Sequence, residues 1–316
     1  MRVIVTGGAG FLGQLVARRL LDEGAERVTL VDLAAPRGDL ADDPRVELRL
    51  GDLAETLPAL DPADVVIHLA AVVSSAAEAD FDLGMRVNVD ATRALLERAR
   101  AWGTAPVVVF SSSLAVFGAD PYAAAPDVIT DDSLPRPQSS YGIQKFIGEQ
   151  LVADYTRKGF IRGRSVRLMT VAVRAGEPNA AASSFVSGII REPLAGVEAV
   201  CPVDPDLPII VSSPRATVEG ILAAARADDD AWGSRTAMNL PGLTTTPREM
   251  AAALDRVTGE DTSRFIRWER DAAIEAIVAS WPARFAADRA EGLGLASESS
   301  FDDIVRAYRE DLAAAA

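Results

Sequence analysis

A glycine-rich segment near the start of the chain constrains the fold more than any other feature. The residues TGGAGFLG, at positions 6–13, lie between a strand-like apolar run and a helical pattern. Gly7 permits a tight turn, Gly10 lets a ligand approach the backbone, and Gly13 lets the helix pack closely on the strand. The start of the helix then offers unpaired N–H groups to an anion. The segment therefore predicts a strand–turn–helix unit that binds the pyrophosphate of a dinucleotide.

Strand-like runs alternate with helical patterns through the first half of the chain. The strand-like runs are Val3–Thr6, Arg27–Val31, Val46–Leu50, Val65–Leu69, Val107–Ser111 and Val166–Val173. The helical patterns are Phe11–Glu23, Phe81–Trp102 and Ser140–Arg157. Apolar strands that alternate with helices are typical of a parallel sheet covered on both faces. We therefore predict the α/β class, with a Rossmann-type doubly wound parallel sheet.

The composition changes after Gly176, where proline, serine and alanine become frequent. Helical patterns return at Ala216–Ala227 and Pro247–Thr258. We expect residues 1–176 to form a nucleotide-binding domain. Residues 177–316 are expected to form mainly a smaller substrate-capping region, interleaved with the end of the sheet.

Charge and composition exclude several classes of function. The net charge of −14 disfavours nucleic acid and anionic membrane surfaces as partners. No apolar run reaches the roughly 18 residues of a membrane span. A single histidine, His68, and a single cysteine, Cys201, leave no zinc cluster, so we expect no metal site. We expect His68 to pack at a strand end and Cys201 to be a small buried hydrophobic residue. One cysteine cannot form an intrachain disulfide, which favours a cytoplasmic protein.

Asp32 ends the second strand-like run and stands 19 positions after Gly13. This is close to the roughly 20 residues that separate a dinucleotide loop from its ribose-binding carboxylate. The carboxylate accepts hydrogen bonds from the adenosine ribose hydroxyls of NAD and repels the 2′-phosphate of NADP. Leu33 follows it, so no arginine stands directly beside it to bind that phosphate. The position therefore predicts NAD as the cofactor.

Tyr141 and Lys145 stand four residues apart and share one face of a predicted helix. Tyrosine has an ordinary pKa near 10, and lowering it to about 7 takes roughly 4 kcal/mol. An ammonium group at about 4 Å, in an effective dielectric near 20, supplies an interaction of that order. Ser111-Ser112-Ser113 ends a predicted parallel strand, where side chains face the ligand crevice. The three motifs together predict a site that removes a proton beside a nicotinamide ring.

These motifs resemble those of the extended short-chain dehydrogenases/reductases, which include UDP-sugar epimerases and sugar dehydratases. The resemblance covers residues 1–225. It implies that Ser113 orients the reacting hydroxyl, that Tyr141 accepts its proton and that Lys145 lowers the tyrosine pKa and binds the nicotinamide ribose. It also implies that Asn88 acts near the reaction centre, in a relay that returns the proton to solvent. The cofactor-binding residues implied by the loop and the resemblance are Gly7, Gly10, Phe11, Leu12, Gly13, Asp32, Asp52, Leu53, Leu69, Ala70, Ala71, Asn88, Tyr141, Lys145, Met169 and Val171. For the apolar members, core packing is the competing interpretation.

The second half most resembles the D-erythronate dehydrogenase branch of this family. The runs that carry this resemblance are residues 174–185, 188–196, 201–203 and 213–215. It implies oxidation of the C2 hydroxyl of a small sugar acid to a 2-oxo acid, with NAD as hydride acceptor. A carboxylate substrate needs a cation, for which an arginine fork is well suited. The expected substrate-binding residues are Ser113, Tyr141, Arg174, Asn179, Arg191 and Arg215, and for each arginine a structural ion pair is the alternative.

Two other functions fit the same motifs. A nucleotide-sugar 4-epimerase uses the same three residues but retains NAD through the cycle. A non-catalytic NAD-binding regulator is a remoter alternative, because such proteins usually lose the tyrosine or the lysine. The resemblance also implies a homodimer, in which the helices near residues 81–102 and 140–157 pair across a two-fold axis.

Overall fold

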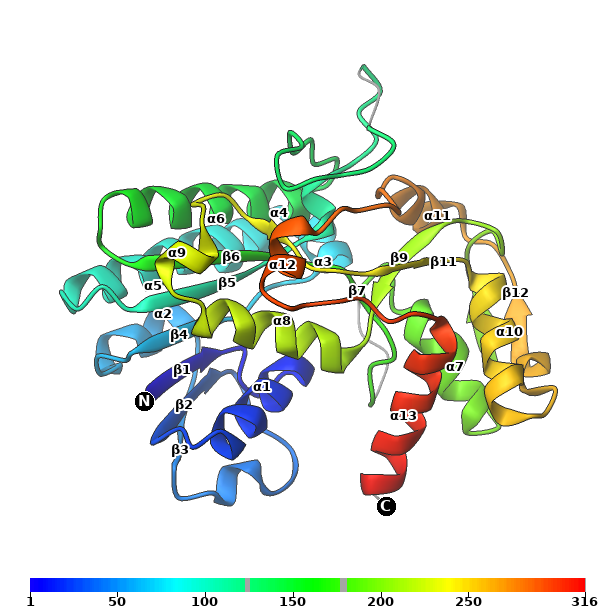
Figure 1. Ribbon diagram of the computed structural model, residues 1–316, viewed down its shortest axis with the longest axis horizontal. Helices are drawn as coiled ribbons and strands as arrows, with labels where there is room; N and C mark the ends of the chain where they lie inside the picture. The colour runs from blue at the N-terminus through cyan, green and yellow to red at the C-terminus, as the bar shows by residue number, and fades with distance from the viewer. Residues whose placement is uncertain (123–125, 177–180, 316) are drawn as a thin grey trace. The chain divides into compact units, whose positions relative to one another are not determined.

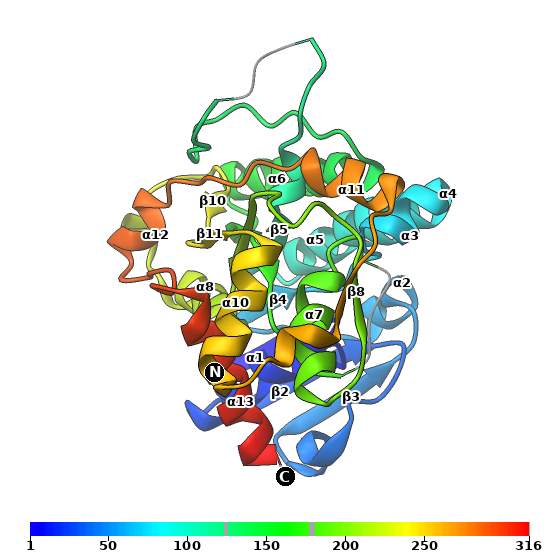
Figure 2. The same ribbon diagram turned by 90° about the vertical axis from the view of Figure 1, so that its right-hand side faces the viewer.

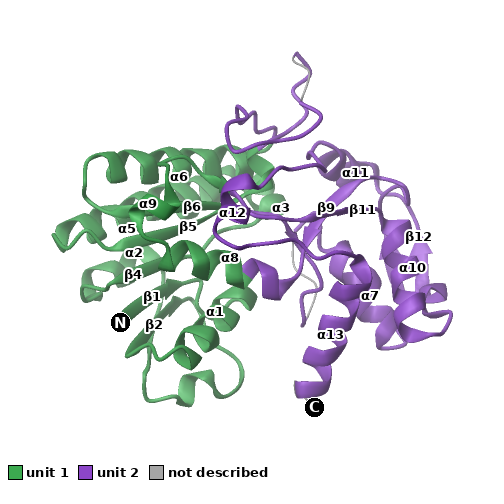
Figure 3. Ribbon diagram, viewed as in Figure 1, with its two compact units in different colours: residues 1–116, 139–167, 218–238 green, residues 117–138, 168–217, 239–316 purple. Residues whose placement is uncertain are grey.

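The structure is a computed structural model that describes residues 1–122, 126–176 and 181–315 (Figure 1). The chain divides into two compact units, and each is drawn in its own colour in Figure 3. Unit 1 comprises Met1–Val116, Ser139–Arg167 and Val218–Met238. Unit 2 comprises Phe117–Gln138, Leu168–Thr217 and Asn239–Ala316. The division into a nucleotide-binding domain over 1–176 and a capping region over 177–316 stays a prediction.

Unit 1 is built on a mostly parallel sheet. Its strands are β1 (Arg2–Thr6), β2 (Arg27–Asp32), β3 (Val46–Leu50), β4 (Val65–His68), β5 (Val107–Ser113), β6 (Arg162–Leu168) and β10 (Met238–Asn239). They hydrogen-bond in the order β10-β6-β5-β4-β1-β2-β3. β1 pairs in parallel with both β2 and β4, and β5 continues the parallel ladder beside β4. This strand order is the Rossmann order, so the predicted fold class is confirmed.

Helices cover both faces of this sheet (Figure 1). The longer helices of unit 1 are α1 (Phe11–Asp22), α5 (Ala91–Ala101), α6 (Ser140–Arg157) and α8 (Pro214–Arg226), the last of which begins in unit 2. On one face, Val66 and Val108 of the strands pack in one apolar core with Leu95 of α5 and Val152 of α6. On the other face, ion pairs of Arg19 with Glu219 and of Arg226 with Glu23 join α1 to α8.

Two predicted elements differ in detail from the structure. The expected helix over 81–102 consists of α4 (Phe81–Gly84), a π-helical turn at Met85–Asp90, and α5. The expected strand over 166–173 divides into β6 and the short β7 (Thr170–Val171), which belongs to another sheet. Apolar periodicity cannot reveal either change, because the pattern of buried and half-buried side chains continues across each break.

Unit 2 has smaller sheets and its own apolar core. β9 (Ile209–Ser212) lies between β7 and β11 (Leu243–Thr245), and β8 (Ala199–Cys201) pairs with β12 (Ile266–Trp268). Helices α7 (Phe185–Leu194), α10 (Pro247–Thr258) and α13 (Phe301–Ala315) contribute to one core (Figure 2). Shorter helices are α2 (Leu53–Thr56), α3 (Ser74–Ala79) and α9 (Asp229–Trp232) in unit 1, and α11 (Ala272–Ala279) and α12 (Asp288–Gly292) in unit 2.

Helix α10 shows why a pattern of residues can fix the ends of a helix. Thr246 caps its start, where the side-chain oxygen accepts a hydrogen bond from the Glu249 N–H at 3.2 Å. Pro247 follows at the first helical position, where a missing N–H costs nothing. Gly259 ends the helix with φ of +74°, a left-handed conformation that glycine adopts without strain. The bounds predicted from the sequence therefore agree with those observed.

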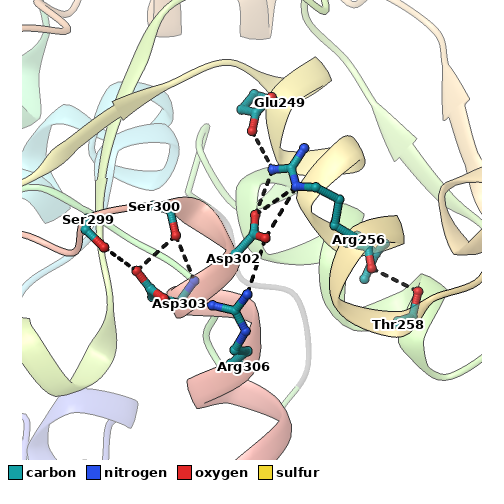
Figure 4. A network of polar contacts seen from close by, with 9 residues as sticks. Glu249, Arg256, Thr258, Ser299, Ser300, Asp302, Asp303 and Arg306 are labelled. Carbon is teal, nitrogen blue, oxygen red and sulfur yellow. Dashed lines mark hydrogen bonds and ion pairs between the residues drawn. The ribbon is translucent and has the colours of Figure 1, made fainter.

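An ion-pair network joins α10 to α13 in unit 2 (Figure 4). Arg256 contacts the carboxylates of Glu249 and Asp302, and Arg306 also contacts Asp302. The guanidinium of Arg256 lowers the pKa of the Asp302 carboxyl. Charge pairing thus supplements the apolar packing between these two helices.

Candidate active site

The glycine loop leaves no room for side chains at Gly7, Gly8 and Gly13. Gly7 has φ of +69°, and a Cβ there would lie 2.8 Å from the backbone nitrogen of Ala70. A Cβ at Gly13 would lie 2.1 Å from the carbonyl oxygen of Gly7. At Gly10 the closest atom to a Cβ would be the same oxygen, at 3.1 Å. The loop therefore brings β1, α1 and the residues after β4 into close backbone contact.

The start of α1 is suited to an anion. Gly10 is its N-cap, no side chain caps it, and its first turn carries no acidic residue. The first N–H groups of a helix have no partner within the helix, and the helix dipole favours negative charge there. The described residues thus fit the pyrophosphate of a dinucleotide at Phe11, Leu12 and Gly13.

Asp32 is tied to the same loop. Its Oδ2 atom accepts a hydrogen bond from the Ala9 N–H at 2.9 Å, and its Oδ1 atom accepts one from the Leu33 N–H at 2.7 Å. The carboxylate therefore stands at the end of β2 beside the glycine loop. Its remaining lone pairs suit the ribose hydroxyls of NAD.

The segment that follows β4 is held from two sides. On one side, the Leu69 N–H donates to the carbonyl oxygen of Thr6 at 3.1 Å. On the other side, the buried amide of Asn88 binds both backbone groups of Val72. Leu69, Ala70 and Ala71 are half-buried between these anchors. The π-helical turn that carries Asn88 is of a kind often found at functional sites.

The three serines at the end of β5 have three different surroundings. Ser111 is buried and donates its hydroxyl to the carbonyl oxygen of His68 at 2.9 Å. Ser112 is buried and donates to the carboxylate of Glu149 at 2.5 Å. Ser113 is half-buried, and its oxygen accepts from the Ala115 N–H at 3.2 Å. Ser113 is thus the serine whose hydroxyl proton has no acceptor among the described residues.

Tyr141 and Lys145 lie in the first two turns of α6. Ser139 caps this helix, since its side-chain oxygen accepts from the Gly142 N–H at 3.2 Å. The Lys145 Nζ atom lies 5.7 Å from the centre of the Tyr141 ring. Tyr141 is half-buried and Lys145 is only 3% exposed. The pair predicted from the i, i+4 spacing is therefore brought together.

Burial sets the electrostatics of Lys145. Loss of hydration lowers its pKa to about 7, and the negative charge of Glu149 opposes that shift. Its Nζ atom donates a hydrogen bond to the carbonyl oxygen of Ser111 at 2.7 Å. Glu149 in turn forms a buried ion pair with Arg167 at 2.9 Å. The next turn of α6 and strand β6 thus each carry a further buried charged group, Glu149 and Arg167.

His68 does more than pack at a strand end. Thr92 donates its only hydroxyl proton to the carbonyl oxygen of Asn88 at 2.8 Å, so it accepts from His68 Nε2 at 2.9 Å. The His68 Nδ1 atom then accepts from the Thr6 hydroxyl at 2.6 Å. Burial and the nearby Lys145 charge lower the pKa of His68 to about 3. The ring is therefore neutral, with its proton on Nε2.

The other predicted cofactor residues have structural partners of their own. Asp52 caps α2 and accepts from the Ala54 N–H at 2.8 Å, while Leu53 packs against the core of unit 1. Met169 is buried and Val171 is half-buried, and both belong to unit 2. Their assignment to the cofactor stays a prediction.

The predicted substrate arginines lie in unit 2. Arg215 pairs with Glu310 and Asp311 at 2.9 and 2.6 Å. Arg191 pairs with Glu192 at 2.5 Å and donates to the carbonyl oxygen of Arg174 at 2.9 Å. The Arg174 N–H donates to the hydroxyl of Ser187 at 3.0 Å.

Two further predictions concern residues outside the catalytic group. Asn179 lies outside the described residues. Cys201 is buried, as expected, and burial raises the pKa of its thiol to about 11.

Two buried polar residues next to the predicted catalytic residues were not predicted from the sequence. Gln144 and Glu149 are buried polar residues on α6, and each bonds to a residue of another element. The only signal for Glu149 was a charged residue on the apolar side of the helix, between Gly148 and Val152.

Among the described residues, no group of His, Cys, Asp and Glu side chains could hold a metal ion. In that same part of the chain, no helix is long and apolar enough to cross a membrane.

Comparisons with known proteins agree with this geometry. Residues 3–204 match the model of the NAD dependent epimerase/dehydratase family. A D-erythronate dehydrogenase from Cupriavidus necator is 50% identical, with 98% of each chain covered. Another from Haemophilus influenzae is 41% identical and covers 98% of this chain and 99% of its own length. The crystal structure of a nucleoside-diphosphate-sugar epimerase from Agrobacterium tumefaciens superposes with a TM-score of 0.90, at 40% identity over 98% of this chain and 94% of that one. The chain belongs to the NAD-dependent epimerase/dehydratase family of extended short-chain dehydrogenases/reductases.

Proposed function

We propose that this protein is an NAD-dependent dehydrogenase that oxidises the C2 hydroxyl of a small sugar acid, such as D-erythronate, to the 2-oxo acid. The single observation that carries the proposal is the near full-length similarity, at 50% identity, to a D-erythronate dehydrogenase. The similarity covers 98% of the chain and therefore extends through unit 2.

The chemistry follows from three side chains of unit 1. Tyr141, as phenolate, takes the proton of the C2 hydroxyl, while Ser113 hydrogen-bonds the same oxygen and fixes its orientation. Bound NAD supplies the acceptor for the hydride that leaves C2. Lys145 stabilises the phenolate by its charge, and it is anchored for this by the Ser111 carbonyl. The substrate loses one proton and one hydride, so its alcohol carbon becomes a ketone.

A direct assay tests this proposal. The purified protein is mixed with NAD and a panel of four- to six-carbon sugar acids, and NADH is followed by absorbance. We expect NADH to accumulate with D-erythronate, and Tyr141→Phe to lower kcat by at least about a hundredfold, as for loss of an acid–base group. Full NAD reduction by Tyr141→Phe would show that another group is the base.

A second candidate function is a nucleotide-sugar 4-epimerase, favoured by the 40% identity to the nucleoside-diphosphate-sugar epimerase from Agrobacterium tumefaciens. Epimerisation returns the hydride to the substrate, so it is net neutral in NAD. Turnover of UDP-sugars without steady NADH accumulation would favour this function over the dehydrogenase.

Recognition of the acid is proposed for at least one of Arg174, Arg191 and Arg215. Arg215 already pairs with two carboxylates, and Arg191 with one carboxylate and one carbonyl. Each arginine is changed to methionine in turn, and KM is measured for the sugar acid and for its uncharged amide. The binding arginine is the one whose loss raises KM for the acid alone.

We propose that the enzyme is a cytoplasmic homodimer that takes part in carbohydrate metabolism. The single buried cysteine supports a reducing compartment. Phe81 of α4 and Ile143 of α6 are 61% and 48% exposed, which supports pairing through these helices. Light scattering of the purified protein and of Phe81→Asp tests the dimer, which the aspartate is expected to weaken.

A further inference from the structure

We infer that Gln144 is a positioning residue, which fixes the Asn88 amide against the helix that carries Tyr141 and Lys145. Gln144 is only 1% exposed and its Oε1 atom accepts from Asn88 Nδ2 at 2.7 Å. The inference deepens the proposed function, on which it rests for its catalytic consequence.

The backbone of Val72 determines how both amides are oriented. Its N–H donates to Asn88 Oδ1 at 2.8 Å, so the oxygen of Asn88 must face that nitrogen. The Asn88 Nδ2 atom then faces the Val72 carbonyl oxygen, to which it donates at 2.9 Å. Its second proton points at Gln144, which must present its oxygen and not its nitrogen. The orientation of Gln144 therefore follows from a neighbour whose atoms cannot be interchanged.

The same orientation is energetically unfavourable for the nitrogen of the Gln144 amide. Its Nε2 atom is buried and has no hydrogen-bond partner among the described residues. An unpaired buried donor is unfavourable, and an apolar residue of similar size would avoid the penalty. The chain nevertheless keeps an amide here. The hydrogen bond that the oxygen makes to Asn88 is the feature that explains its presence.

Gly84 is matched to the Gln144 side chain. A Cβ at Gly84 would lie 2.4 Å from Gln144 Nε2 and 2.9 Å from Oε1. Gly84 has φ of −57° and ψ of −49°, which any residue in a right-handed helix adopts. The backbone therefore does not require glycine, but the space taken by Gln144 does. The two residues form a matched pair across α4 and α6.

The consequence for catalysis lies in what Gln144 connects. It stands beside Lys145 and one turn after Tyr141 on α6. Through Asn88 it reaches Val72, which follows the segment Leu69–Ala71 after β4. Loss of the Gln144 oxygen would release α6 from this segment without removing any group that touches the substrate.

Kinetics of three variants test the role. Gln144→Met keeps the volume and removes the acceptor, Gln144→Glu keeps an acceptor oxygen, and Gln150→Met is the control at an exposed position of α6. With the sugar acid, we expect Gln144→Met to lower kcat by roughly ten- to a hundredfold, as for misplaced catalytic groups, with KM for NAD changed less than about threefold. Gln144→Glu should regain most of this loss, and Gln150→Met should match the wild type. Wild-type kcat in folded Gln144→Met would overturn the inference.

A stability cycle tests the geometry without any substrate. We expect Gly84→Ala to lower the folded-to-unfolded ratio by about tenfold or more, because it overpacks the site. In a Gln144→Ala background the same change should raise that ratio by about fourfold, as alanine favours a helix over glycine. Urea unfolding of the four proteins measures both effects. Equal effects of Gly84→Ala in the two backgrounds would overturn the pairing.

The two tests separate the possible failures. If no sugar acid reduces NAD but the cycle shows the reversal of sign, the proposed function fails and the Gln144–Gly84 pairing stands. If the sugar acid is oxidised but Gln144→Met behaves as the wild type, the function stands and the positioning role fails.

Discussion

At the scale of single residues, the most consequential feature is a buried lysine whose ammonium group donates to a backbone carbonyl oxygen. Lys145 donates to a carbonyl oxygen, and burial lowers its pKa from the ordinary 10.5 to about 7. Below pH 7 the folded and unfolded states both hold the proton. Between pH 7 and 10.5 the unfolded state binds more protons, so stability rises with pH.

We therefore predict that Lys145→Met changes the pH dependence of stability. Between pH 6.5 and 9.5, the ligand-free protein with Lys145 should gain about 3 kcal/mol relative to the variant. Both proteins carry Tyr141→Phe, so that the phenol does not titrate. Urea unfolding at the two pH values gives the free energies. An unchanged difference between the pair would show that Lys145 keeps its ordinary pKa when buried.

A second prediction concerns His68, the only histidine of the chain. Its pKa of about 3 and its hydrogen bonds to Thr6 and Thr92 require a neutral ring protonated at Nε2. The nitrogen-15 NMR shifts of this ring should show that tautomer and stay constant from pH 5 to 9. A titration with a midpoint near 6.5 would contradict the buried chain of hydrogen bonds. Thr92→Val, which removes the acceptor, should alter the Nε2 shift selectively.

These residues also mark the limit of inference from the sequence. The pairing of Tyr141 with Lys145 could be predicted, because a spacing of four fixes their common helix face. The role of Gln144 could not be predicted, because it depends on contacts with Asn88 and, through it, Val72, which are distant in sequence and near in space. A glutamine has no distinctive chemistry that would single it out without these neighbours.

At the scale of elements, the bounds of some helices were predicted from the sequence, whereas changes inside elements were not. The caps at Thr246, Pro247 and Gly259 explain why α10 begins and ends where the helical pattern predicted. The π-helical turn at Met85–Asp90 carries Asn88, which bonds to Val72 and Gln144, whereas the amphipathic pattern predicted a plain helix there. Local rules thus suffice where caps satisfy the backbone and fail where a distant residue reshapes it.

The contact between α10 and α13 makes a prediction at this scale. Arg256 lowers the pKa of Asp302 below its ordinary 3.8, so the ion pair stabilises the fold above that pH and the effect is lost as pH falls further. Asp302→Asn should lower the melting temperature at pH 7, by the modest amount typical of accessible pairs. The difference in melting temperature between this variant and the wild type should be smaller at pH 3.5. Calorimetry at both pH values, with the exposed Asp127→Asn as control, measures this, and an equal deficit at both would exclude a charge effect.

At the scale of the whole molecule, the fold class was predictable because short apolar runs recur along unit 1 with helical patterns between them. The strand order of the sheet agrees with that prediction. Unit 2 was less predictable, since its strands are two to four residues long and carry little periodic signal. The chain also passes from unit 1 into unit 2 after Val116 and after Arg167, where no local sequence pattern marks the boundary.

The choice of cofactor is best tested through the stability of the whole chain. A ligand that binds only the folded state adds about 2.7 kcal/mol at a hundredfold excess over its dissociation constant, which raises the melting temperature by several degrees. NAD should give this shift. NADP at the same concentration should give much less, because the Asp32 carboxylate, anchored by the Ala9 and Leu33 N–H groups, repels a 2′-phosphate. Asp32→Asn should narrow the difference by removing the repulsion while it keeps a hydrogen-bonding oxygen. Equal shifts with NAD and NADP in the unaltered protein would mean that Asp32 does not face the ribose.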